Sequence, residues 1–197
     1  QKDLGLNIKQ SNLCSEITLP TNEERTAVCC LSSVNLEHYD KWSKEEEFIS
    51  DLITMLDNVV QHFIDNAIDT TELGDYNANF KRFKNHIREG KEGFTKSSFS
   101  AYRERSLGLG AMGFHAYLQK NNIPFEGIFA TGFNNKAFGY IKNKAMEASK
   151  VLAEHRGEAP DITGTGMRNA HLLAVAPNAS SSIICGGTSP SIEPYRA

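Results

Sequence analysis

Asn12-Leu-Cys-Ser-Glu-Ile-Thr-Leu19 is the stretch from which the fold prediction starts, because its alternation is typical of a loop that runs into a strand. Pro20-Thr21-Asn22 follows with residues that favour a turn. The next apolar run, from Ala27 to Val34, predicts a second strand. We therefore expect a hairpin or two neighbouring strands in this part of the chain.

Helical periodicity begins after these strands. Ser43 is a suitable N-cap with Glu46 three positions on, and apolar residues recur at helical spacing from Phe48 to Ile64. A second helix is expected from about Asn134 to about His155, before Gly157 and Pro160. These are the two long helices that the pattern predicts.

Three further segments complete the expected element order. The polar, irregular stretch from Asp69 to Ser100 is interpreted as a loop with at most a short helix, and a helix should start within the glycine-rich run from Leu107 to Leu118. The continuous apolar run His171 to Ala176 suits a strand buried on both faces. Strands interleaved with helices indicate an α/β fold.

Composition narrows the function classes. The chain has 197 residues, 40% of them hydrophobic, which is enough to bury a core, and its length indicates one domain or two. Its net charge of −3 comes from 21 basic and 24 acidic residues without a concentrated basic run, which argues against direct binding to nucleic acid or a membrane surface. With neither a long apolar stretch nor a signal segment, we expect a soluble, cytoplasmic chain cut from something longer.

Cysteine and histidine spacing argues against a metal site. Cys14, Cys29, Cys30 and Cys185 do not form CxxC pairs or a dense disulfide pattern, so they are expected to be reduced thiols. The six histidines form neither an HxxxH nor an HExxH pair.

Gly108-Leu-Gly-Ala-Met-Gly113 formally matches the dinucleotide fingerprint GxGxxG. The preceding segment is not a buried strand, and no convincing acidic residue ends a second strand about twenty residues on, so we reject this interpretation. We expect these glycines to let a strand and a helix pack closely.

Asn12, Cys14 and Glu16 lie at alternate positions, and in an extended segment they would point to one side. A thiol, a carboxylate and an amide in one place could act on a substrate carbon, accept a proton from a neighbouring hydroxyl and orient the substrate. Taken alone, the triplet favours a simpler alternative, a buried cysteine with the amide and carboxylate turned to solvent.

Four separated motifs change this balance: Ser11-Asn-Leu-Cys-Ser-Glu-Ile17, Ala27-Val-Cys-Cys-Leu-Ser-Ser33, Pro177-Asn-Ala-Ser-Ser-Ser182 and Ser191-Ile-Glu-Pro194. In this order they resemble the central region of the large (alpha) subunit of class I, class Ia-like, ribonucleotide reductases. The resemblance covers essentially the whole chain. It implies that residues 1–197 are a partial catalytic barrel domain, part of a ten-stranded α/β barrel with the radical cysteine on an inner loop.

The resemblance implies roles for individual residues. Cys14 matches the cysteine that becomes a thiyl radical and removes the 3′ hydrogen of a ribonucleotide, and Glu16 matches the carboxylate that deprotonates the 3′ hydroxyl. Asn12 matches the amide that orients the substrate, and Ser11 beside it is expected to contact the substrate.

The second motif implies a redox thiol at Cys29, whose family partner lies upstream of Gln1. Cys30 departs from the family pattern, in which threonine or a similar residue is commonest, so either sulfur could be the reductant. Because consecutive strand residues face opposite sides, only one can look into the site. We assign Cys29, because the motif that carries the resemblance places the redox cysteine two residues before Leu31-Ser32. Cys30 is then expected to be a small buried apolar residue.

The third motif is expected to hold the substrate diphosphate. It follows a predicted strand and opens a helix, where free backbone N–H groups attract an anion. The residues matched to phosphate binding are Pro177, Asn178, Ala179, Ser180 and Ser181.

Together these matches imply a ribonucleoside-diphosphate reductase large subunit, inactive without its missing parts. The implied partners are a ribonucleoside diphosphate, the remainder of the large subunit, a metal-containing small subunit that supplies the radical, and thioredoxin or glutaredoxin as reductant. No cofactor is expected in this chain, and nucleotide effectors are expected to bind outside it. Two alternatives stay open: a non-catalytic assembly or regulatory module of reductase shape, and a cobalamin-dependent class II reductase.

Overall fold

The computed structural model describes residues 6–67 and 95–195, and its centre is a pair of parallel strands. β1 (Cys30–Asn35) pairs with β2 (Leu107–Met112), with Cys30 opposite Leu107 and Asn35 opposite Met112. Parallel strands require a long crossover connection, which here contains helices. This arrangement confirms the predicted alternation of strands and helices.

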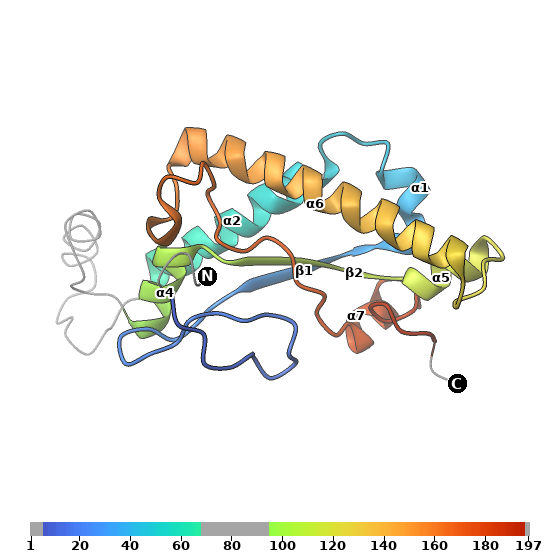
Figure 1. Cartoon of the computed structure of the whole chain (residues 1–197), viewed down its shortest axis with the longest axis horizontal. Helices are drawn as coiled ribbons and strands as arrows, with labels where there is room; N and C mark the ends of the chain where they lie inside the picture. Colours follow the sequence, from blue (N-terminus) through green and yellow to red (C-terminus); the bar gives the residue numbers. More distant parts are fainter. Residues whose placement is uncertain (1–5, 68–94, 196–197) are drawn as a thin grey trace.

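Helices α2 (Phe48–Asn66) and α6 (Ile128–Arg156) cover one face of the strand pair. Because side chains alternate along a strand, Leu107, Leu109 and Ala111 all point into the core beneath these helices. The opposite face carries the intervening residues of both strands. In Figure 1 the N-terminal segment and α7 (Ala179–Ile184) lie on that second side.

The crossover begins with η2 (Leu36–His38) and α1 (Tyr39–Trp42). Ser43 is the C-cap of α1, so the prediction that it opens the long helix was wrong, and α2 has Glu47 as its N-cap. Serine suits either end of a helix. Here Trp42 Nε1 donates to Asn35 O at 2.8 Å and so holds α1, the short helix that Ser43 ends, in place before α2. Most of the predicted loop from Asp69 to Ser100 lies outside the described residues, and its end belongs to α4 (Lys96–Glu104).

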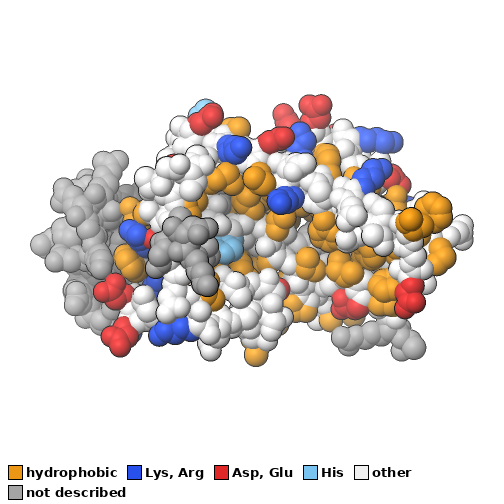
Figure 2. Space-filling model, viewed as in Figure 1, with side chains coloured by type: hydrophobic (Ala, Val, Ile, Leu, Met, Phe, Trp, Pro, Cys, Tyr) orange, Lys and Arg blue, Asp and Glu red, His pale blue; other side chains and the backbone are white. Residues whose placement is uncertain are grey.

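The second long helix, α6, begins at Ile128 rather than near Asn134. Its buried face continues toward the N-terminus through Phe133 and Ala130, whereas Ile128 and Phe129 are 81% and 75% exposed and break the amphipathic pattern. Figure 2 shows hydrophobic side chains gathered at this end of the molecule. Exposed apolar patches of this kind are typical of surfaces that contact other protein.

The glycine-rich run from Leu107 to Leu118 forms β2 and then α5 (Phe114–Lys120), which confirms a helix start within it. Gly108 and Gly110 lie in the strand, but their close neighbours are Leu31, Cys29 and Ala174 rather than a helix. The glycines therefore bring β2 close to other extended segments, and the expectation of strand-to-helix packing was wrong for these two positions.

The segment from His171 to Ala176 runs beside β2 but is not a regular strand. One parallel bridge joins Leu109 to Leu173, supported by Leu109 N donating to Leu172 O at 2.8 Å. Val175 is 39% exposed, so the prediction of burial on both faces was wrong. Within the described residues this segment contacts β2 along one side. η4 (Pro160–Ile162) lies in the connection that leads to it.

Candidate active site

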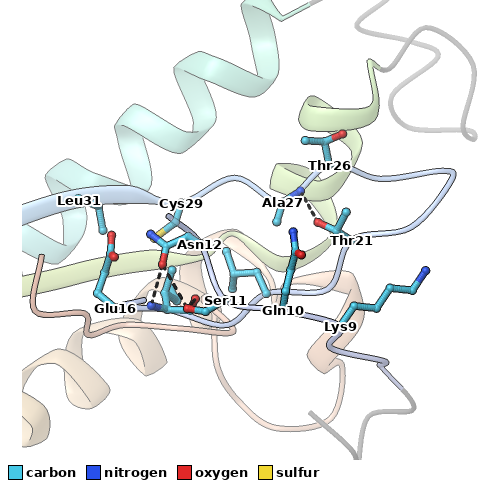
Figure 3. Close-up of a pocket in the computed structure, with 12 residues that line it drawn as sticks. Lys9, Gln10, Ser11, Asn12, Glu16, Thr21, Thr26, Ala27, Cys29 and Leu31 are labelled. Carbon is cyan, nitrogen blue, oxygen red and sulfur yellow. Dashed lines mark hydrogen bonds between the residues drawn. The ribbon is translucent and has the colours of Figure 1, made fainter. Parts of the chain in front are cut away.

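A cavity of about 510 Å³ lies between the N-terminal segment and the strand face opposite the helices. Figure 3 shows side chains from two walls pointing into it, one wall before Pro20 and the other leading into β1. The lining residues are Lys9, Gln10, Ser11, Asn12, Glu16, Ile17, Leu19, Thr21, Thr26, Ala27, Cys29 and Leu31. The cavity therefore brings the first two sequence motifs together.

Residues 12–16 form a tight turn and no strand follows through Leu19, so the expected hairpin or pair of neighbouring strands was wrong. The second of the two predicted strands, from Ala27 to Val34, is confirmed in part as β1. Ser15 N donates to Asn12 O at 3.1 Å, Asn12 N donates to Ile17 O at 3.2 Å, and Ser15 has φ of 62°. This left-handed backbone at Ser15 closes the turn, and serine gives little indication of it in a sequence.

The turn separates the three residues that an extended segment would have placed on one side. Asn12 and Glu16 line the cavity, whereas Cys14 lies at the exposed tip of the turn, next to Leu13, which is 99% exposed. Cys14 therefore lies next to the cavity along the chain without contributing to its lining.

Ser11 and Asn12 stabilise the base of the turn. Ser11 Oγ donates to Ile17 O at 2.9 Å, and Asn12 Oδ1 accepts a long hydrogen bond from Ile17 N at 3.4 Å. Both side chains still border the cavity. In the structure, the hydrogen bonds of Ser11 and Asn12 stabilise the turn that presents Cys14.

Glu16 supplies a carboxylate to the cavity. Its Oε2 is buried and has no hydrogen-bond partner among the described residues, although buried polar atoms are nearly always paired. In Figure 3 Glu16 lies at the same end of the cavity as Asn12 and Cys29. A carboxylate oxygen held without a protein donor is able to accept a proton or a hydroxyl hydrogen bond from a ligand.

Cys29 and Cys30 face opposite sides of the chain, as their adjacency predicts. Cys29 lines the cavity, whereas Cys30 packs against the main core beneath the helices. Burial raises the pKa of the Cys29 thiol to about 12, helped by the negative charges of Cys30, Glu16 and Glu104. Cys29 is therefore protonated at neutral pH and carries a hydrogen that it could donate.

Pro177 to Ser181 precede and open α7, so the prediction that a helix begins here is confirmed. Asn178 is buried, and its Nδ2 donates to Ala176 O at 2.8 Å and to Ala111 O at 3.3 Å. This side chain thus holds the loop against the end of β2. Pro177, Ala179, Ser180 and Ser181 are exposed, and the N–H groups of a first helical turn have no partner within the helix.

Sequence reasoning missed the other end of the cavity. Lys9, Gln10, Thr21 and Thr26 line it, and Figure 3 places Lys9 far from Glu16. These residues lie in irregular segments without periodicity, so nothing in the sequence indicates which way they face.

No group of three or more His, Cys, Asp or Glu side chains in residues 6–67 and 95–195 is placed to hold a metal ion. No helix in those same ranges is long and apolar enough to cross a membrane.

The family described as ribonucleotide reductase, barrel domain, matches this chain over residues 2–164 and 159–197. The chain belongs to the ribonucleotide reductase family. The barrel expected from the sequence motifs is therefore confirmed, and the two parallel strands and their helices are a part of it.

Individual ribonucleotide reductases agree with this assignment. The chain is 48% identical over 197 residues to the ribonucleoside-diphosphate reductase large subunit of Invertebrate iridescent virus 3, covering 100% of this chain and 28% of the relative. It is 51% identical over 193 residues to a putative large subunit of Frog virus 3 (isolate Goorha), covering 98% of this chain and 30% of the relative.

A solved structure places the chain with class I. The class Id ribonucleotide reductase alpha subunit of Actinobacillus ureae superposes with a TM-score of 0.82 at 37% identity, covering 100% of this chain and 34% of that one. This confirms the class I resemblance. The chain spans about a third or less of the length of these relatives.

Proposed function

We propose that this chain forms the radical-thiol part of the active site of a class I ribonucleoside-diphosphate reductase large subunit. One observation carries the proposal: Asn12, Glu16 and Cys29 line one cavity beside the turn that presents Cys14. The 48% identity to a viral ribonucleoside-diphosphate reductase large subunit over the whole chain supports it. The substrate would be a ribonucleoside diphosphate and the product its 2′-deoxy form.

The chemistry assigns one task to each group. A thiyl radical on Cys14 takes the 3′ hydrogen atom of the ribose, and Glu16 accepts the 3′ hydroxyl proton while Asn12 orients the sugar. Cys29 and a second thiol from the rest of the subunit supply two electrons and two hydrogens and close to a disulfide. One of these hydrogens goes as a proton to the 2′ hydroxyl, which leaves as water, and the other goes to the 2′ carbon. Glu16 returns the proton to the 3′ oxygen, and Cys14 returns the hydrogen atom to the 3′ carbon.

The exposed first turn of α7 is the proposed diphosphate site. The N–H groups of Ala179, Ser180 and Ser181 lie where a helix start attracts an anion, with Pro177 and Asn178 shaping the approach. Asn178 would act by holding the loop, because its side chain already binds Ala176 and Ala111. Ser11 would support the substrate pocket in a similar way through its bond to Ile17.

The proposed reaction also requires groups from the remainder of the large subunit and from partner proteins. A metal-containing small subunit would generate the radical, and thioredoxin or glutaredoxin would re-reduce the dithiol. The remainder of the large subunit would enclose the cavity, which protects a radical from side reactions with water. Effector nucleotides would bind outside this chain, which we expect to act in the cytoplasm.

A hybrid subunit tests the proposal. In it, this chain replaces the matching 197-residue region of the Invertebrate iridescent virus 3 large subunit, and it is assayed with that virus's small subunit and thioredoxin. We expect deoxynucleoside diphosphate formation from the hybrid. Cys14→Ser should lower it roughly 1,000-fold or more, since an indispensable reacting group is lost.

Cys185→Ser is the matched control, because Cys185 is also an exposed thiol but lies beyond α7. We expect it to retain most of the activity. Full activity in the Cys14→Ser hybrid would exclude the radical assignment. A correctly assembled but inactive hybrid would favour the non-catalytic alternative.

A further inference from the structure

Arg25 is buried within an otherwise exposed loop. Its residue surface is 5% exposed, whereas Thr21 to Glu24 and Thr26 on either side are all exposed. Arginine is rarely buried without a charged partner. A loop that turns one arginine inward while its neighbours face solvent is anchored at that arginine.

The anchor is Asp161 in η4. Arg25 Nη2 lies 2.7 Å from Asp161 Oδ2, with side-chain exposures of 6% and 3%. The other carboxylate oxygen accepts from Arg103 Nε of α4 at 2.7 Å. The Arg25 guanidinium also lies over the ring of Phe99, 5.8 Å from its centroid. One aspartate therefore joins this loop to both η4 and α4.

The anchored loop is a wall of the candidate active site. Thr21 and Thr26, on the two sides of Arg25, both line the cavity, and the same wall continues to Cys29. The loop is braced internally, because Asn22 Oδ1 accepts from Arg25 N at 3.0 Å and Ala27 N donates to Thr21 Oγ1 at 3.1 Å. Beyond Cys29 the chain enters β1. Cys29 thus lies between two fixed points, the Arg25 anchor and the sheet.

We propose that Arg25 and Asp161 are positioning residues for the reductant thiol: their buried ion pair fixes the cavity wall that carries Cys29. This inference rests on the proposed function. Removing Asp161 leaves the buried Arg25 charge uncompensated, whereas removing Arg25 takes away the bond of the loop to η4 although Arg103 still neutralises Asp161. In either case the loop should move away from Asp161. A displacement of about 1 Å at a reacting group is enough to slow a reaction strongly.

The structure offers a matched pair of variants for the test. Arg25 and Arg103 both donate to Asp161, but Arg25 belongs to the cavity wall and Arg103 belongs to α4. Arg25→Gln and Arg103→Gln remove the same charge from the same carboxylate. The Arg25 side chain is 6% exposed and that of Arg103 is 39% exposed, so Arg25→Gln is expected to cost more stability and the two variants are compared at equal folded fraction. Under that condition, a purely structural role of Asp161 would make the two substitutions act alike at Cys29.

Two measurements on the hybrid subunit decide between these cases. The first is the rate of maleimide labelling at Cys29, read by peptide mass spectrometry with Cys185 as internal reference. We expect Arg25→Gln and Asp161→Asn to label about tenfold faster at Cys29, because a loosened wall exposes the thiol, while Arg103→Gln labels at the unchanged rate. The second measurement is steady-state turnover. Compared with the unsubstituted hybrid, Arg25→Gln should lower kcat about tenfold and change KM by no more than about twofold.

Equal Cys29 labelling in Arg25→Gln and Arg103→Gln would overturn the inference, as would equal kcat values when the unsubstituted hybrid makes product. Labelling needs no catalysis, so it still decides the matter if the hybrid makes no product and the proposed function fails. If Arg25→Gln does not fold, Arg25→Lys and Arg103→Lys replace the pair, with faster Cys29 labelling expected in Arg25→Lys alone.

Discussion

Gly110 of β2 lies directly against the backbone of Ala174, so that a Cβ at position 110 would stand 2.3 Å from the Ala174 carbonyl oxygen. This approach allows the segment from His171 to Ala176 to run beside β2 and reach the loop that precedes α7. The absence of a side chain at Gly110 therefore helps to place the proposed diphosphate site.

Gly110→Ala should destabilise this part of the hybrid subunit by about 1–3 kcal/mol, since backbone cannot yield as a flexible side chain can. Hydrogen exchange should become faster at the amides of Leu109 and Ala174, which bond across the contact. Gly139→Ala is the control: it lies inside α6 with no atom within 4 Å of the added Cβ and should stabilise the helix by about 0.5–1 kcal/mol. Unchanged exchange in Gly110→Ala would refute the close contact.

A buried aspartate joins the helical layer to the strands. Asp57 of α2 accepts from Arg105 Nε at 3.0 Å, Arg156 Nη1 at 2.8 Å and Asn169 Nδ2 at 3.1 Å, and Arg168 Nε lies 3.4 Å away. Asp57→Asn would leave three arginines around a neutral amide and should destabilise α2 by about 3–5 kcal/mol. Exchange of the α2 amides measures this. Asp51→Asn, the same change at an exposed position of α2, should cost about 1 kcal/mol or less.

The same carboxylate makes stability depend on pH. Burial alone would raise the pKa of Asp57, but the charge and hydrogen bond of Arg105, with Arg168 and Arg156, hold the pKa below its ordinary value. Because the pKa of Asp57 is lower in the folded chain than in the unfolded chain, its carboxylate stabilises the fold. This stabilisation is complete above about pH 4, the ordinary pKa of Asp, and is lost as pH falls through the folded pKa. Thermal unfolding between pH 6 and 3 should show this loss, and Asp57→Asn should make the profile shallower. Parallel profiles would contradict it.

Periodicity predicts helices that bury the same face along their whole length. Ile53 in α2 and Ile141 in α6 each belong to a series of buried apolar residues at helical spacing, so both helices could be found from the sequence. Alternation likewise separates Cys29 from Cys30. The start of α6 could not be placed, because the exposed Ile128 and Phe129 obscure its pattern.

Other features depend on contacts between distant parts of the chain. Arg25 meets Asp161 across 136 positions, and nothing local indicates that either residue is buried. The turn at Ser15 depends on a left-handed backbone that serine seldom adopts. The cysteine motif was therefore recognisable from the sequence, but the exposed position of Cys14 was not.

The environment of Cys29 leads to a prediction about its reactivity. Burial, followed by the charges of Cys30, Glu16 and Glu104, raises the pKa of the Cys29 thiol to about 12, and thiolate is the form that reacts with maleimide. At pH 8, Cys29 should therefore label at least about tenfold more slowly than the exposed Cys185, and its rate should still rise with pH up to pH 11.

Glu16→Gln removes one of the negative charges that raise the pKa of Cys29. It should shift the pH profile of Cys29 labelling to lower pH and leave the Cys185 profile in place. Glu158→Gln is a suitable control, because that carboxylate is engaged with Gly164 and Gly166 rather than with the cavity. A Cys29 profile that is the same in Glu16→Gln and Glu158→Gln would show that Glu16 and Cys29 do not share one electrostatic environment, and would remove the geometric basis for placing both at one substrate.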